Sequence, residues 1–355
     1  MNSETNFDTN KKSKIKYLIL IALFITISVM SLIAISRFVN DQSFKLSFGI
    51  LSKGIIIKLI ALAPVYFLMD TLRFYFILKA IDVKISLGYI AKLTFINMFI
   101  SNITPFATGG GLAQIHFLTK KDIHIADATA ATSIRTVIPL IFFSITAPLI
   151  LIFNKSIVGM TTSIHTALYT IILVSINLMT ILGFYLLIRN PKKIKRLLLY
   201  FTIRLRTKKI IKSTRSKRKI IKALHTIDRF SSNIKRYLSG QRKYLMLSLL
   251  STLGFLTTSF YFTVVLIKGL NSSVSTITIL LSQIVVTYFM YFAPTPGATG
   301  IAEGGFTLLF KSFVKSGEIV TVTFMWRFFT IYIGFIIGAT LFYFEIFRTE
   351  RNNNQ

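Results

Sequence analysis

The hexapeptide TPFATG at residues 104–109 recurs as TPGATG at residues 295–300, with five of its six positions identical. Proline removes a backbone donor, and glycine adopts conformations that helices exclude, so each copy predicts a break in a helix. One repeated hexapeptide is not decisive in a chain of this length. The residues that we assign to the two broken segments are Thr104, Pro105, Gly109, Gly110, Gly111, Thr295, Pro296, Gly297 and Gly300.

The surroundings of the two breaks are also alike. Each break follows an apolar segment and precedes a short apolar piece, at 112–118 in the first case and 306–314 in the second. An arginine then stands 30 residues after the proline of the first break (Arg135) and 31 residues after the proline of the second (Arg327). This shared layout favours two halves that are built alike.

The composition indicates a membrane protein. Of the 355 residues, 53% are hydrophobic and only 15% are charged, whereas soluble domains carry about 25% charged residues. Lys and Arg number 42 against 12 Asp and Glu, for a net charge of +30. Such a charge on a soluble protein would suggest nucleic acid. Together with long apolar runs, it favours the anionic membrane surface as the partner, and we expect no nucleic acid.

Eight apolar segments approach the roughly 20 residues that a helix needs to cross a bilayer. We therefore expect an all-α polytopic membrane protein with about eight transmembrane helices and two re-entrant or broken segments. The predicted spans are 17–36, 55–80, 88–103, 128–153, 162–188, 244–267, 276–293 and 319–344. The first could be a secretory signal, but its length and the lack of a small-residue cleavage site favour a retained anchor.

Basic residues orient the spans. The loop 189–243 holds 20 of the 42 Lys and Arg residues and one acid, so it is predicted to be cytoplasmic, together with the N-terminus 1–16 and the tail 346–355. The halves 17–153 and 162–345 then enter the cell membrane from opposite sides. The sequence thus predicts an inverted-topology repeat with both termini in the cytoplasm.

The basic loop also has a helical pattern. Apolar residues recur in it at helical spacing, at Ile220, Leu224, Ile227, Ile234 and Leu238. This pattern predicts an amphipathic helix in the headgroup layer. A loop that only sets the topology is an equally good interpretation.

Broken helices inside a bilayer point to a binding site. Freed backbone groups are tolerated there only where protein or a watery cavity covers them. Paired Gly/Pro-interrupted segments in two halves are typical of transporter sites near the midplane, and amides at the start of a helix favour an anion such as phosphate. Bends between tightly packed helices are the alternative interpretation.

Charged side chains at membrane depth sharpen this hypothesis. The candidates are Asp70, Arg73, Arg135, Glu303 and Arg327. A charge at the bilayer centre costs about 2.5–3.5 kcal/mol, so it normally faces a cavity or a partner. Asp70 and Arg73 are three residues apart on one helix and are spaced to pair, either for structure or for function. Arg135 and Arg327 either snorkel to an interface or share a headgroup-binding role, which their similar placement favours.

The sequence shows no recognisable catalytic motif. The four histidines are scattered without ligand spacing, at His116, His124, His165 and His225. The glycines 109–111 lack the strand and the lysine of a phosphate-binding loop. We predict no catalytic residue, no metal site and no cofactor.

Three stretches carry a family resemblance: TPFATGGGLAQIHFLTKKDI (104–123), APTPGATGIAEGGFTLLF (293–310) and WRFFTIYIGFIIG (326–338). Over about residues 14–347 the chain resembles the lysylphosphatidylglycerol synthase transmembrane-region family, the flippase-like membrane domain of phosphatidylglycerol lysyltransferase. The resemblance implies movement of aminoacylated phosphatidylglycerol or a related lipid between leaflets. Bifunctional members add a soluble lysyl-transfer domain, which we do not expect here. Other relatives are linked to polyprenyl-phosphate sugars, and many carry an acid where this chain has Gln114.

We therefore expect a lipid flippase or lipid-binding transporter whose partners are membrane phospholipids with anionic headgroups. Arg135, Arg327 and the short-helix amides would hold the lipid phosphate, and Glu303 or Asp70 would balance a cationic headgroup. Arg73 and Gln114 complete the predicted headgroup site. The alternative is a membrane subunit or enzyme of lipid modification that works with a separately encoded soluble transferase. A small-solute transporter is a third, weaker hypothesis.

Overall fold

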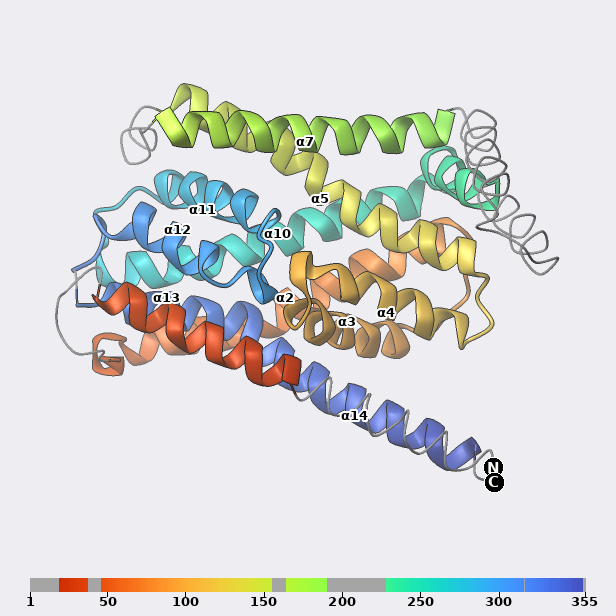
Figure 1. The fold of residues 1–355 in the computed structure, drawn as a ribbon, viewed down its shortest axis with the longest axis horizontal. Coiled ribbons are helices and arrows are strands. Elements are labelled where there is room, and N and C mark those ends of the chain that lie inside the picture. The colour runs from red at the N-terminus through yellow and green to blue at the C-terminus, as the bar shows by residue number, and fades with distance from the viewer. Residues whose placement is uncertain (1–18, 38–45, 155–163, 190–227, 316, 354–355) are drawn as a thin grey trace, which may run out of the picture.

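The computed structural model describes residues 19–37, 46–154, 164–189, 228–315 and 317–353, and every regular element in these ranges is a helix (Figure 1). The predicted all-α class is confirmed. The first half contains the helix Ile19–Arg37, η1 (Phe48–Ile50), α2 (Lys53–Ala80), α3 (Leu87–Asn102), η2 (Pro105–Ala107), α4 (Thr108–Thr119) and α5 (Ile125–Phe153). The second half begins with α7 (Ile164–Arg189). The second half contains the helix 228–239, α10 (Arg242–Leu270), α11 (Thr276–Met290), η3 (Pro296–Ala298), α12 (Ile301–Phe310), α13 (Ile319–Arg327), the π-helical turn η4 (Phe328–Tyr332) and α14 (Ile333–Asn353).

The protein is multi-pass. Within the described residues, five helices are long and apolar enough to cross a membrane: Ile19–Arg37, Lys53–Ala80, Ile125–Phe153, Arg242–Leu270 and Ile319–Glu345. The predicted span 162–188 falls on α7, except for residues 162 and 163, which lie outside the described ranges. α3 and α11 have 16 and 15 residues, about 24 and 22 Å at 1.5 Å per residue. Two of the eight predicted spans are therefore shorter than a hydrocarbon core of about 30 Å.

These two short helices belong to helical hairpins. The first hairpin is α3–η2–α4, and the second is α11–η3–α12. They occupy opposite ends of the helical body in Figure 1, and their tips η2 and η3 contact each other between those ends. A long helix precedes each hairpin (α2 or α10), and α2 and α10 pack closely against each other.

Left-handed backbone makes the hairpin tips. In η2 the φ angles of Phe106 and Ala107 are 53° and 52°, and in η3 those of Gly297 and Ala298 are 60° and 56°. Only glycine adopts this region without cost. Both predicted breaks are confirmed, and the short helices after them begin at Thr108 and Ile301, earlier than the apolar pieces suggested.

The C-terminal helix packs along the first hairpin. α14 packs closely against α3. At Gly338 a side chain would lie 2.0 Å from the carbonyl oxygen of Phe95, so glycine permits this close approach. Lys92 of α3 and Glu345 of α14 form an ion pair further along the contact. The last helix is therefore coupled to the first hairpin by packing and by charge.

The helix 228–239 rests on the protein body. Ile234, Tyr237 and Phe230 are buried in the apolar cluster that also contains residues of α3, α4 and α14. Leu238 is exposed, and the predicted face residues Ile220, Leu224 and Ile227 lie outside the described ranges. The described part of the predicted amphipathic helix thus packs on protein through Ile234.

Candidate functional site

The first ion cluster consists of Asp70, Arg73 and Arg135, and all three side chains are buried. Arg73 lies one helical turn after Asp70 on α2 and donates from Nε to Asp70 Oδ1 at 2.5 Å. Arg135 reaches from α5 and donates from Nη2 to both carboxylate oxygens at 2.8 Å. Two guanidinium groups share one carboxylate, so the cluster carries a surplus of one positive charge.

Aromatic rings surround this cluster. The guanidinium of Arg73 lies 4.0 Å from the ring centre of Phe255 on α10, and that of Arg135 lies 5.0 Å from the ring centre of Phe74. Such cation–π contacts stabilise desolvated arginines. Tyr291, at the end of α11, interacts electrostatically with all three charges and is 37% exposed. The cluster therefore lies near the end of α11, in the second hairpin.

The second ion pair joins Glu303 of α12 to Arg327 of α13, and both side chains are 0% exposed. Arg327 Nε lies 2.8 Å from Glu303 Oε1, and Arg327 Nη2 donates to the carbonyl oxygen of Gly297 at 2.6 Å. Glu303 Oε2 accepts from the amide of Gly300 at 2.7 Å and from Ser31 Oγ of the first helix at 3.2 Å. This pair is electrically neutral, and it binds the broken backbone of the second hairpin at two points.

The two hairpin tips differ in exposure. Residues 105–108 of the first tip are exposed, and Phe106 retains 57% of its accessible surface. In the second tip Pro296 is buried, and a side chain on Gly297 would lie 2.6 Å from the ring of Phe24. The first break is therefore open, whereas the second is packed against the first helix.

Threonine hydroxyls stabilise both breaks. Thr104 Oγ1 accepts from the amide of Gly109 at 3.1 Å and donates to the carbonyl of Ile100 at 2.8 Å. Thr295 Oγ1 donates to the carbonyl of Thr299 at 2.7 Å. These bonds satisfy backbone groups that a helix break leaves without partners.

Residues 16–338 match the family described as the lysylphosphatidylglycerol synthase TM region. The chain belongs to this family. A UPF0104 membrane protein of Archaeoglobus fulgidus is 22% identical over 299 residues, which cover 82% of this chain and 86% of that relative. No solved structure matches the chain. The family match spans both hairpins and both ion groups, so the resemblance carried by the three sequence stretches is confirmed.

The predicted site residues of this family member fall into separate groups. The structure brings Asp70, Arg73 and Arg135 together in one place, and Glu303 and Arg327 in another. The spacing of Asp70 and Arg73 predicted their pairing, whereas nothing in the sequence indicated the contribution of Ser31. A role of any of these residues in binding a headgroup stays a prediction.

The three consecutive glycines have different surroundings. A side chain at Gly109 would lie 2.6 Å from Thr104, and one at Gly110 would lie 2.5 Å from Asn97 Oδ1 of α3. At Gly111 the nearest neighbour would be Thr132 of α5, at 3.2 Å. The first two glycines therefore allow α4 to pack closely on α3.

Gln114 lies further along α4 and is buried. Its Nε2 has no hydrogen-bond partner within the part of the chain that the structure describes. In the same part of the chain, no group of three or more His, Asp or Glu residues is placed to hold a metal ion.

Proposed function

We propose that this chain moves an anionic phospholipid between leaflets, with phosphatidylglycerol or an aminoacylated derivative as the cargo. The observation that carries the proposal is the buried surplus charge of the first ion cluster. The family description, which names lysylphosphatidylglycerol, supports the lipid class. The reaction is transport, and the acyl chains would remain in the bilayer while the headgroup passes the cluster.

The charge of the cluster suits a phosphodiester. A lipid phosphate carries one negative charge, which would neutralise the surplus of Asp70, Arg73 and Arg135. Charge-assisted bonds from a guanidinium to phosphate are strong and can be bidentate. Arg135 Nη1 is buried and makes no hydrogen bond to any described residue, so it is a donor available to a ligand. Burial of an unmatched charge is costly unless a counterion is bound, which favours an anionic cargo.

The exposed first break supports a polar path through the protein. Backbone that is irregular at membrane depth is tolerated where it lines a watery cavity. Residues 105–108 are exposed in the tip that meets η3. We infer that this tip faces the path of the headgroup, while the packed second tip forms the opposite wall.

We further infer an inverted repeat that works by alternating access. The order long helix, short helix, turn, short helix, long helix occurs twice in the chain, and the two hairpins approach each other from opposite ends of the body (Figure 1). Rocking of one repeat against the other is the usual mechanism for such architectures. The basic segment 189–243 places both termini in the cytoplasm in this proposal.

A leaflet-accessibility assay tests the function. The purified chain is reconstituted in vesicles that contain tail-labelled phosphatidylglycerol or, separately, tail-labelled phosphatidylcholine. We expect faster movement of phosphatidylglycerol than in protein-free vesicles, and at least tenfold slower movement with Arg135→Gln, a loss of about 1.4 kcal/mol or more. Lys58→Gln is the matched control, because Lys58 is an exposed cation on α2. Wild-type protein that moves no more lipid than empty vesicles would disprove the proposal.

The family description also favours a second candidate, a membrane subunit of a lipid-modifying enzyme, because it names a synthase. Incubation of the purified chain with lysyl-tRNA and phosphatidylglycerol, with and without a soluble lysyltransferase, separates the two functions. Transport predicts no lysylated lipid from the chain alone. Product that forms only with both proteins would support the subunit.

A further inference from the structure

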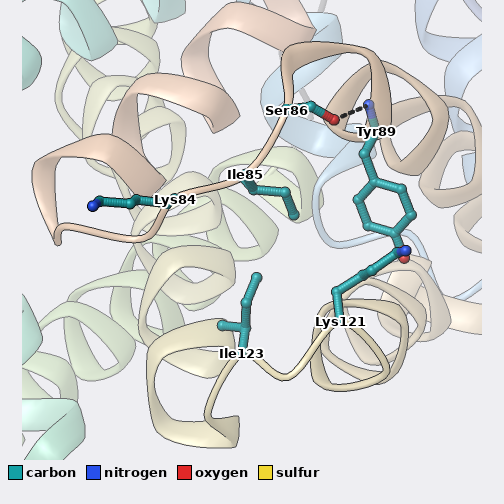
Figure 2. Close-up of a pocket in the computed structure, with 6 residues that line it drawn as sticks. All are labelled: Lys84, Ile85, Ser86, Tyr89, Lys121 and Ile123. Carbon is teal, nitrogen blue, oxygen red and sulfur yellow. Dashed lines mark hydrogen bonds between the residues drawn. The ribbon is translucent and has the colours of Figure 1, made fainter.

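A pocket of about 250 Å³ lies at the base of the first hairpin, far from its tip. Its walls come from the turn between α2 and α3 and from the turn between α4 and α5. The lining residues are Lys84, Ile85, Ser86, Tyr89, Lys121 and Ile123 (Figure 2). The two isoleucines face each other across the pocket, Lys121 extends toward Tyr89, and Lys84 lies at the opposite rim with its ammonium group directed outward. The pocket therefore combines apolar side chains on two facing walls with cations at its rim.

The two lysines have no acidic partner within the described residues. Lys84 and Lys121 are both exposed, and Lys121 Nζ lies over the ring of Tyr89 at 5.6 Å from its centre. The hydroxyl of that tyrosine donates to the carbonyl of Phe117 at 2.9 Å and so closes the pocket on the side of α4. Ammonium groups on long stems are mobile point charges that adapt to an anion.

The acids around the pocket are already occupied. Asp82 accepts from Gln241 at 2.9 Å and lies 3.3 Å from Arg236. Asp127 accepts two bonds from Arg229, at 2.6 and 2.7 Å, and one from Asn233. Both arginines belong to the helix 228–239, which thus neutralises the carboxylates that would otherwise compensate the lysines.

Glu345 of α14 acts electrostatically on Tyr89 and forms an ion pair with Lys92. The acid next to the pocket lysines is Asp122, which follows Lys121 directly. Two lysines against this single carboxylate leave a surplus of one positive charge at the rim. At the base of the second hairpin, the turn 271–275 contains no lysine or arginine, and Asn271 donates to the carbonyl of Phe313 at 3.0 Å, whereas Lys311 and Lys315 belong to the turn after α12.

We propose that this pocket docks the phosphodiester of an anionic lipid headgroup at the surface of the membrane. The lysines would contact the phosphate oxygens, and Ile85 and Ile123 would contact the glycerol carbons. Lysines next to a membrane attract anionic lipids, and basic pockets at the cytoplasmic side of helices bind their headgroups. The proposal rests on the proposed function only for the choice of lipid, since docking at the rim requires no transport.

Equilibrium binding to the full chain in detergent tests the site. Short-chain phosphatidylglycerol is titrated into the Arg135→Gln variant, which lacks the buried arginine proposed to bind the phosphate. It is also titrated into Arg135→Gln proteins that carry Lys84→Gln, Lys121→Gln or both. We expect roughly fivefold weaker binding for each lysine removed. Lys120→Gln is the matched control, because Lys120 belongs to the same turn but does not line the pocket. Unchanged binding in the lysine variants, or equal weakening by Lys120→Gln, would overturn the proposal.

Two further measurements distinguish a lipid phosphate from free phosphate, and the pocket proposal from the transport proposal. Excess inorganic phosphate should compete poorly with the lipid, and complete displacement at equal concentration would make the pocket a site for free phosphate, against our assignment. Short-chain phosphatidylcholine, which has no net charge, should bind more weakly. If wild-type protein fails to move lipid but the lysine-dependent binding persists, only the proposed function is refuted. Normal transport without that binding refutes only the pocket.

Discussion

Arg135 and Arg327 stand at matching distances from the two breaks, yet they have different electrostatic surroundings. Arg135 shares the carboxylate of Asp70 with Arg73, so its group has a surplus positive charge. Arg327 has Glu303 as a partner and donates to the backbone of the second break. A repeated motif thus fixes where a charge lies but not what neutralises it.

This difference suggests a division of labour. The neutral pair Glu303–Arg327 has the geometry of a clamp, because it contacts the amide of Gly300 and the carbonyl of Gly297. Within the described residues, the side chains of the charged cluster make no such hydrogen bond to the backbone, and the cluster lies near exposed Tyr291. We expect the Glu303–Arg327 pair to stabilise the fold and the cluster of Asp70, Arg73 and Arg135 to act on the cargo.

The largest effect should follow from breaking the clamp. Arg327→Gln leaves Glu303 charged and fully buried, and the loss of one partner of a buried pair costs about 3–5 kcal/mol. Arg135→Gln should cost less, because Asp70 keeps Arg73. Thermal unfolding of the purified variants in detergent measures the order. The double variant Glu303→Gln/Arg327→Gln should recover part of the loss, and a larger cost for Arg135→Gln would reverse the division of labour.

The glycines of the two short helices should respond in opposite directions. Gly110→Ala places a methyl group against Asn97 and Ser101 of α3, and overpacking of this kind costs about 1–3 kcal/mol. Gly304→Ala in α12 meets nothing within 4 Å and should gain roughly 0.5–1 kcal/mol from helix propensity. The same unfolding measurement compares them, with Gly111→Ala as an intermediate case. Equal destabilisation by Gly110→Ala and Gly304→Ala would contradict the difference in packing.

Removal of the surplus charge should make the first group resemble the second. Arg73→Gln leaves Asp70 and Arg135 as a neutral pair. We expect the preference for phosphatidylglycerol over phosphatidylcholine in the leaflet assay to fall about tenfold, equivalent to about 1.4 kcal/mol. Arg73→Lys is the control, because it retains the charge. An unaltered preference in Arg73→Gln would show that the surplus charge does not select the cargo.

The smallest effects should come from the threonines of the breaks. Thr104→Val removes the bond accepted from Gly109 and the donated proton that the carbonyls of Ile100 and Ser101 share, whereas Thr295→Val removes one bond, to Thr299. A typical bond contributes about 0.5–1.5 kcal/mol. Thr104→Val should therefore destabilise the protein by about twice as much as Thr295→Val. Urea midpoints are sensitive enough to rank them, and the reverse order would mean that the second break depends more on its hydroxyl.

The sequence was informative wherever the physics is local. Proline and glycine limit the backbone at their own positions, so both breaks could be predicted without any tertiary contact. The pairing of Asp70 with Arg73 follows from a spacing of three residues on one helix. Long apolar segments likewise predicted the all-helical membrane fold.

Contacts between distant segments could not be predicted in the same way. Asp70 and Arg135 are 65 residues apart, and their meeting depends on how α2 packs against α5. The bond from Ser31 to Glu303 joins the first helix to α12 across 272 residues. A single sequence contains no measure of such packing, so the difference between the two arginines emerged only from the structure.

The π-helical turn η4 sets the phase of the C-terminal helix. It inserts extra backbone between Arg327, which points into the second ion pair, and Gly338, which faces Phe95. One residue corresponds to about 100° of rotation in an α-helix. Deletion of a single residue within 328–332 would restore regular winding, but it would turn Gly338 and Glu345 away from α3. The wide turn therefore sets the rotation of α14 relative to α13. This rotation lets Arg327 face Glu303 while Gly338 faces α3.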